Sequence, residues 1–196
     1  MANADDVAAA VLELTGPITT KKLQKLVYYT QAWHLARHGE AIFEEDVEAW
    51  VEGPIVRSLW SQHRKSYLVS SWPAGNPAAL TSSETETVRW VVRKYGALSA
   101  ESLSRMTHAE TPWLMARSLL PANARSSAPV KKDHMRSYYA RQQVAPDVAV
   151  SLAAANSSLE GIELDDDWQE LLRDVADGTR AADELINQEI RRIRGS

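Results

Sequence analysis

Residues 20–38 carry the pattern that most constrains how this chain folds. Apolar side chains recur there at intervals of three and four residues, at Leu23, Leu26, Val27 and Trp33. That spacing is typical of one face of an α-helix, and we expect these side chains to lie in a protein core. Thr19 or Thr20 can cap the start of the helix, and Gly39 stands where a helix commonly ends.

Similar but shorter patterns predict a mainly α protein with one small β-hairpin. Further helices are expected in the first part of the chain over residues 3–14, 55–66, 88–95, 99–106, 112–119 and 131–141. Residues 43–50 suit a short strand, and Glu52-Gly53-Pro54 forces a turn directly after it. Residues 67–82 are expected to form a surface loop, and residues 121–129 an irregular segment.

The formal charge of −4 is unevenly distributed, which predicts two parts. Residues 148–196 contain 11 acidic and 5 basic residues, whereas residues 1–147 contain 15 acidic and 17 basic residues. We therefore expect a helical domain over residues 1–145 and a three-helix C-terminal segment over residues 148–196. The three tail helices are expected over residues 151–160, 168–175 and 185–193, with Gly161 ending the first of them.

The composition restricts the class of protein. The chain contains no Cys, which excludes a disulfide scaffold and a Cys-based zinc site and fits a reducing compartment. Its N-terminal segment is acidic where a signal peptide is basic, and no stretch approaches the roughly 18 apolar residues that span a bilayer. Neither part is basic enough to indicate nucleic-acid binding. We therefore expect a cytoplasmic protein without a membrane or nucleic-acid partner, and 7 Trp against 1 Phe hint at a binding surface.

Candidate catalytic and metal-binding residues are few. His34 and His38 lie one helical turn apart, but Leu35 stands where a zinc protease needs Glu. His108 with Glu110 could supply a general base, although a hydrogen-bonded structural His at a helix end is the simpler interpretation. Three acids at residues 165–167 open a helix, where they usually form a solvated cap. The chain has no nucleophile elbow, phosphate-binding glycine loop or Cys nucleophile. We expect no enzyme, no cofactor and no metal.

Several spaced motifs in the first part of the chain agree with one known family. They are Lys22 to Tyr29 (KLQKLVYY), Gln31 with Trp33-His34, Glu48-Ala49-Trp50, Glu52-Gly53-Pro54 with Val56, Tyr95-Gly96, Ser99 with Leu103, and Thr107-His108 with Pro112-Trp113. Together they resemble the SocA-like antitoxin family, also called the Panacea domain, over about residues 18–140. The resemblance implies a helical domain with little β-structure, in a two-gene toxin–antitoxin module or a phage-associated protein.

The resemblance does not identify the target, because members of the family neutralise many unrelated toxins. The candidate partner-binding residues within its motifs are Trp50, Glu52, Gly53, Pro54, His108 and Trp113. Trp50 and Trp113 suit interface anchors or buried core residues equally well.

A second group of motifs lies in the tail. Residues 156–161 (NSSLEG) are followed by Leu164, the expected helix of residues 168–175, Gly178 and residues 182–186 (ADELI). This arrangement resembles the VbhA-type antitoxins of Fic toxins over about residues 148–194. The resemblance implies that Glu160 pairs with an arginine of the toxin's Fic motif and obstructs the γ-phosphate of ATP, so that nucleotide transfer fails. The candidate inhibitory motif is Asn156, Ser157, Glu160 and Gly161, with Asn156 where the family has Ser or Thr.

Glu160 also stands out on physical grounds. If Gly161 ends the helix, the Glu160 carboxylate lies at the negative end of the helix dipole, which disfavours it by about 0.3–1 kcal/mol. Such a locally unfavourable residue is typical of a functional site. The alternative is an exposed Glu that costs little.

Three functional hypotheses follow. The first, which we expect, is an antitoxin that binds a Fic-type AMPylating toxin and blocks its ATP site with the Glu160 helix. The second is an antitoxin or proteolytic adaptor for an unrelated, non-Fic toxin, acting through the first domain. The third is a hydrolase that uses His108 with Glu110.

Overall fold

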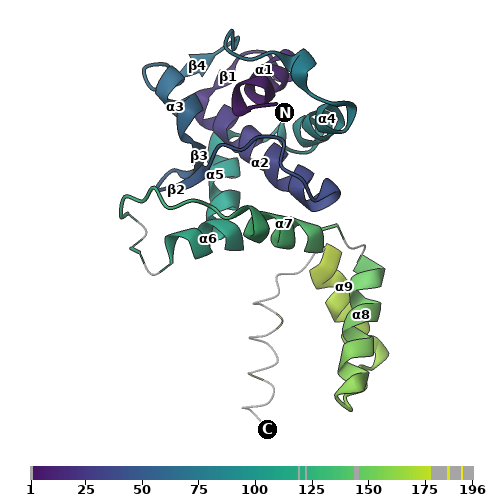
Figure 1. The fold of residues 1–196 in the computed structure, drawn as a ribbon. Coiled ribbons are helices and arrows are strands. Elements are labelled where there is room, and N and C mark those ends of the chain that lie inside the picture. The colour runs from purple at the N-terminus through teal and green to yellow at the C-terminus, as the bar shows by residue number, and fades with distance from the viewer. Residues whose placement is uncertain are drawn as a thin grey trace. The chain divides into compact units, whose positions relative to one another are not determined.

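The computed structural model describes residues 2–118, 120–121, 123–143 and 146–177, together with Leu185 and Arg191 (Figure 1). The chain divides into two compact units, residues 1–140 and residues 141–196. The protein is mainly helical with a small two-stranded hairpin, as the sequence predicted. In the part of the chain that the structure describes, no helix is both long and apolar enough to cross a membrane.

The elements of the first unit follow one another closely along the chain. They are α1 (Ala4–Thr15), β1 (Ile18–Thr19), α2 (Thr20–His38), β2 (Val47–Trp50), β3 (Gly53–Val56), α3 (Arg57–His63), β4 (Leu68–Val69), the short 3₁₀ helix η1 (Pro77–Ala79), α4 (Ser82–Tyr95), α5 (Ala100–Ala109), α6 (Thr111–Arg117) and α7 (Lys132–Arg141). The strands form two antiparallel pairs, β1 with β4 and β2 with β3.

Helix α2 is the centre of the first unit and packs against α1, α4, α5 and β3 (Figure 1). The side chains expected in the core are buried, with Leu23, Leu26 and Val27 fully inaccessible to solvent. Burial is not confined to one face, however, because every residue from 23 to 35 is buried. The apolar spacing therefore predicted the core face correctly and missed the polar side chains that are buried beside it.

Those buried polar side chains hold neighbouring loops. The Gln31 carboxamide accepts from the Ile42 N–H at 2.8 Å and donates to the Phe43 carbonyl at 2.7 Å. Because this side chain engages the backbone of Ile42 and Phe43, the strand expected over residues 43–50 begins only at Val47. Buried polar groups need such partners, since an unpaired one costs about 1–3 kcal/mol.

Capping residues determine several helix ends. Thr19 caps α2 and Gly39 ends α2 in the left-handed conformation, as expected. Asn3 caps α1 in a capping box. Helix α4, which the apolar pattern at residues 88–95 indicated, begins at Ser82, where Thr81 and Glu84 form a capping box.

The hairpin differs from its prediction in two details. The expected turn at Glu52-Gly53-Pro54 lies at Val51 and Glu52, and Gly53 and Pro54 belong to β3. The helix expected over residues 55–66 begins at Arg57, because residues 53–56 pair with β2. Residues 67–82 are largely a loop, as expected, but they include β4 and η1.

The second unit contains α8 (Pro146–Leu159) and α9 (Asp166–Asp177), which pack against each other. Gly161 ends α8 as expected: its φ is +79°, Gly161 N–H donates to Ser158 O, and Ile162 N–H donates to Ser157 O. This pair of hydrogen bonds is a Schellman motif. The Asp165 carboxylate accepts from Trp168 N–H at 2.8 Å, which confirms the expected cap. The third tail helix falls outside the described residues, apart from Leu185 and Arg191, and stays a prediction.

Candidate partner-binding site

The β2–β3 hairpin is fixed to the helices beneath it by side-chain hydrogen bonds. Four of its carbonyl groups accept from side chains of α2, α5 and α6. The pairs are Lys25 Nζ with Pro54 O, Ser104 Oγ with Glu52 O and Trp113 Nε1 with Trp50 O, each at 3.0 Å, and Arg117 Nη1 with Ala49 O at 3.1 Å. Side chains far apart in the sequence therefore hold the hairpin in one position.

Both edges of the hairpin are also occupied. Along β2, Ala49 N–H donates to Ala128 O at 2.8 Å and Val130 N–H donates to Val47 O at 2.7 Å. Along β3, the Gln24 carboxamide bonds both the N–H and the carbonyl of Val56. A partner strand cannot add to an edge whose backbone groups are already paired, so this hairpin offers side chains, not free strand edges, for contact.

Gly53 is required by the close approach of the hairpin to α2. Its φ of +97° lies in the region that favours glycine, and a Cβ placed on it would lie 2.6 Å from Lys25 Nζ and 3.0 Å from Thr107 Oγ1. The Glu52-Gly53-Pro54 motif thus brings the Pro54 carbonyl within reach of the Lys25 ammonium.

Lys25 is completely buried on α2. The pKa of its ammonium group is lowered to about 7, chiefly by burial and also by the Lys21 charge, while the Glu52 carboxylate opposes the shift. Lys21 itself pairs with Glu52 at 2.8 Å on the outer side of the hairpin. The two lysines, one turn apart on α2, therefore support the hairpin from inside and from its rim.

An open hollow of about 600 Å³ lies beside the hairpin turn, with Trp50 and Trp60 among its walls. Their ring centroids are 5.0 Å apart at an interplanar angle of 59°. The remaining lining residues are Val51, Glu52, Arg125, Ser126 and Ser127. We call this the Trp50–Trp60 hollow. Both tryptophans are half-buried, so aromatic surface faces solvent there.

The Glu48 carboxylate orients the rim of this hollow. It accepts from Trp50 Nε1 at 2.6 Å and pairs with Arg57 at 3.7 Å. The Arg64 guanidinium lies 6.0 Å from the centroid of the Trp60 ring. The Trp60 ring also borders a second, smaller hollow that contains Lys21, Lys25, His63 and Arg64 in its lining.

The six candidate partner-binding residues gather around the hairpin but differ in exposure. Trp50 is half-buried and Glu52 is exposed. Gly53, Pro54 and Trp113 are buried, so Trp113 takes the core position that the sequence left as an alternative. His108 stacks on Trp113 with ring centroids 4.4 Å apart, and its Nε2 has no hydrogen-bond partner within the described residues. The hydrogen bond expected for a structural His is therefore not made by that atom.

His108 and Glu110 face different surroundings, which does not favour the hydrolase hypothesis. The buried Glu110 carboxylate accepts hydrogen bonds from three tyrosine hydroxyls, those of Tyr139 at 2.6 Å, Tyr29 at 3.0 Å and Tyr28 at 3.3 Å. Burial raises the pKa of Glu110 to about 7, although the three tyrosine hydrogen bonds lower it. This cluster ties α7 to α2 and the start of α6.

Glu110→Gln is expected to remove a pH dependence of stability that the parent protein shows between pH 4.5 and about 7. The folded state of the parent keeps the Glu110 proton up to about pH 7, whereas the unfolded state loses it near 4.5. The parent therefore loses stability, on the order of 3 kcal/mol, as the pH rises through this window. Urea unfolding of both proteins at several pH values gives the difference between them.

Tyr139→Phe provides the contrast for this experiment. It removes one of the hydrogen bonds that lower the Glu110 pKa, so the loss of stability should extend to higher pH. Parallel stability curves for the parent protein and Glu110→Gln would show that Glu110 does not hold a proton in the folded state.

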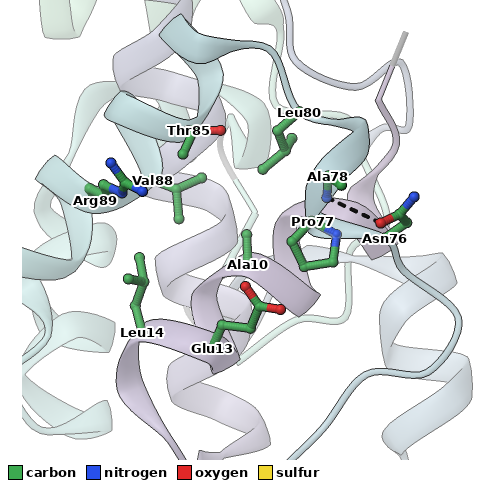
Figure 2. A pocket seen from close by; sticks show the side chains of 10 residues that line it. All are labelled: Ala10, Glu13, Leu14, Asn76, Pro77, Ala78, Leu80, Thr85, Val88 and Arg89. Carbon is green, nitrogen blue, oxygen red and sulfur yellow. Dashed lines mark hydrogen bonds between the residues drawn. The ribbon is translucent and has the colours of Figure 1, made fainter.

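Another hollow, of about 380 Å³, lies between α1, η1 and α4 (Figure 2). Figure 2 shows that its walls are mostly aliphatic, with Glu13 and Arg89 as its charged residues. The hollow lacks the aromatic rings and the group of cations that surround the Trp50–Trp60 hollow, so we do not assign it a function.

His34 and His38, which lie one helical turn apart, differ in their surroundings. His34 Nδ1 lies 3.0 Å from Thr87 Oγ1 and its ring is buried, whereas His38 is exposed, as expected for a packed and a surface histidine. Within the described ranges, no group of three His, Cys, Asp or Glu side chains is arranged to hold a metal.

The candidate inhibitory motif lies at the C-terminal end of α8. Asn156, Glu160 and Gly161 are exposed and Ser157 is half-buried. Glu160 is the capping residue of the Schellman motif, directly beyond the last helical residue, Leu159. Its carboxylate is therefore free of burial and lies where the helix dipole disfavours an anion.

The sequence did not point to Trp60, Arg64 or Arg125 as site residues. Trp60 and Arg64 follow the hairpin on α3 or just beyond it, and Arg125 belongs to the segment that pairs with β2. The one available signal was the tryptophan content of the chain, which indicated a binding surface without locating it.

The described residues of the first unit thus present a fixed hairpin and an open aromatic hollow on a helical core. Residues 23–114 match the family model described as antitoxin SocA-like, Panacea domain. No curated protein and no solved structure matches the chain. The matched segment, somewhat less than half of the chain, runs from α2 into α6 and supports the resemblance to SocA-like antitoxins. The tail lies outside it, so its resemblance to VbhA-type antitoxins remains a prediction.

Proposed function

We propose that this protein is a cytoplasmic, non-enzymatic antitoxin that binds a toxin protein and inhibits it. The match of residues 23–114 to the SocA-like antitoxin domain carries this proposal. The fixed hairpin with its open aromatic hollow supports it, because a preorganised surface loses little conformational entropy on binding. The domain over residues 1–145 supplies the broad contact with the toxin.

The tail supplies the inhibition in this proposal. The toxin is a Fic-type nucleotidyltransferase, and the segment of residues 148–196 carries the inhibitory helix into its nucleotide cleft. Glu160 pairs there with an arginine in the place of the ATP γ-phosphate, with Asn156 on the same helix face in support. The exposure of Glu160 at the end of α8 and the tail's 11 acidic against 5 basic residues favour a cleft that binds phosphates.

A second function uses the first domain alone. In it, the protein is an antitoxin or proteolytic adaptor for a non-Fic toxin, and the tail takes no part in inhibition. The observation that favours it is the position of the matched segment, which lies entirely within the first unit.

Glu160→Gly distinguishes the two functions. Under the Fic proposal, this change restores nucleotide transfer by the purified toxin–antitoxin complex in an assay with labelled ATP. Binding should weaken by no more than about 100-fold, because one charge-assisted hydrogen bond contributes about 1.5–3 kcal/mol. Glu160→Asp should inhibit only partly, because the shorter side chain does not reach the arginine.

Glu163→Gly is the matched control, since Glu163 is also exposed and lies three residues beyond Glu160. It should inhibit like the parent protein. If Glu160→Gly inhibits as well as the parent protein, the Fic mechanism is wrong and the second function takes its place.

A further inference from the structure

Positive charge surrounds the Trp50–Trp60 hollow. Four cationic side chains lie on it or next to its rings, Lys21, Arg57, Arg64 and Arg125, against the two carboxylates of Glu48 and Glu52. The carboxylates are paired with Arg57 and Lys21. Arg64 and Arg125 are exposed, and neither has a carboxylate within ion-pair distance among the residues that the structure describes.

We propose that the Trp50–Trp60 hollow binds an acidic peptide segment of a partner protein, with one large apolar side chain packed against the exposed surface of the two tryptophans and flanking carboxylates on Arg64 and Arg125. A guanidinium is planar and always charged, and its parallel N–H groups match a carboxylate. Tryptophan and arginine are also the side chains that most often dominate binding energy at protein interfaces. Only the identification of that partner as the toxin rests on the proposed function.

The mode of binding follows from the occupied edges of the hairpin. The backbone groups of Val47, Ala49 and Val56 are already paired, so the segment cannot bind by adding a strand. Its affinity must come from the anchoring side chain and from charge. Because the hydrogen bonds beneath the hairpin hold Trp50 in place, the hollow exists before the segment arrives.

A protein segment fits this surface better than a nucleic acid. The cations are few and Glu48 and Glu52 lie among them, whereas a nucleic-acid backbone requires a continuous basic track. The chain as a whole also carries a net charge of −4, which repels a polyanion. A short segment with a few carboxylates around one apolar side chain is repelled less by these negative charges than a nucleic acid is.

Selection of a displayed library of random 12-residue peptides on the immobilised full chain tests the proposal without any toxin. Enriched peptides should contain one aromatic or large aliphatic residue flanked by at least two Asp or Glu residues. A synthetic peptide of that sequence should shift the Trp60 indole N–H signal in NMR spectra. Trp60→Ala should weaken binding of this peptide at least tenfold. The double variant Arg64→Glu, Arg125→Glu should weaken it further, and the same selection on that variant should enrich basic peptides instead.

Trp90→Ala is the matched control, because Trp90 is another half-buried tryptophan, with Arg37 at 3.8 Å and Lys94 at 4.9 Å from its ring centroid. It should leave peptide affinity unchanged, and circular dichroism verifies the fold of each variant. Enrichment of peptides without acidic residues, or binding that Trp60→Ala leaves intact, would overturn the proposal. A 12-nucleotide oligo-dT that displaces the peptide at equal concentration would assign the surface to nucleic acid instead. None of these outcomes depends on Glu160, so the inference and the proposed function can fail separately.

Discussion

A chain that ends at Gln143 is expected to bind the toxin and to lose all inhibition of nucleotide transfer. The hydrophobic core cluster lies wholly between Ala2 and Tyr139, so the shortened chain keeps every residue of that cluster. It also keeps the Trp50–Trp60 hollow, but it loses α8, α9 and Glu160. Transfer of labelled nucleotide by the toxin should therefore return to the level of the free toxin while a pull-down still recovers the complex.

The reciprocal fragment controls for the contribution of the first domain. Residues 144–196 added as a separate chain should inhibit only at much higher concentration, because the first domain no longer raises the effective concentration of the tail, which short flexible tethers bring to about the millimolar range. Full protection by residues 1–143 would instead assign inhibition to the first domain, as in the second proposed function.

Local chemistry made several helix ends predictable from the sequence. Asn3, Thr19, Gly39 and Gly161 act within a few residues of their own position, through capping hydrogen bonds or a positive φ. Their effect depends little on the rest of the fold. The sequence therefore predicted where these helices begin or end better than it predicted the extent of β2.

Long-range hydrogen bonds explain what the sequence did not reveal about the fold. The extent of β2 depends on Gln31, whose carboxamide holds residues 42 and 43, and on Gln24, which holds Val56. Both glutamines lie on α2 and read as ordinary polar positions. The spacing of apolar residues along a helix does not predict which distant backbone group a buried carboxamide binds.

The candidate site was predictable only in part for the same reason. The family motif identified Trp50 and Glu52, which reach the surface, together with Gly53, Pro54 and Trp113, which support the hairpin from within. Arg125 reaches the same hollow only because residues 128–130 pair with β2. A motif that combines surface and supporting residues indicates that the shape of the hairpin matters as much as any single contact.

Lys25, which donates to the hairpin at Pro54 O, makes the stability of the protein depend on pH. Lys25→Met is expected to remove this dependence. Burial lowers the pKa of Lys25 to about 7 in the folded protein, whereas the unfolded chain keeps its proton up to about 10.5. Unfolding therefore takes up a proton between these values, and the parent protein gains stability as the pH rises through the window. The gain is about 1.4 kcal/mol per pH unit and on the order of 4–5 kcal/mol over the whole window.

Lys25→Met keeps a long side chain in the core and has no group that titrates there. Its free energy of unfolding should lack the Lys25 gain, so the difference from the parent protein shifts in favour of the parent by roughly 2 kcal/mol between pH 7 and pH 9. Denaturant unfolding at pH 7, 8 and 9 measures this difference. At high pH the parent should be the more stable protein, because the neutral amine still donates to Pro54 O and methionine leaves that carbonyl unpaired. A constant difference across this range would show that Lys25 keeps its charge when buried.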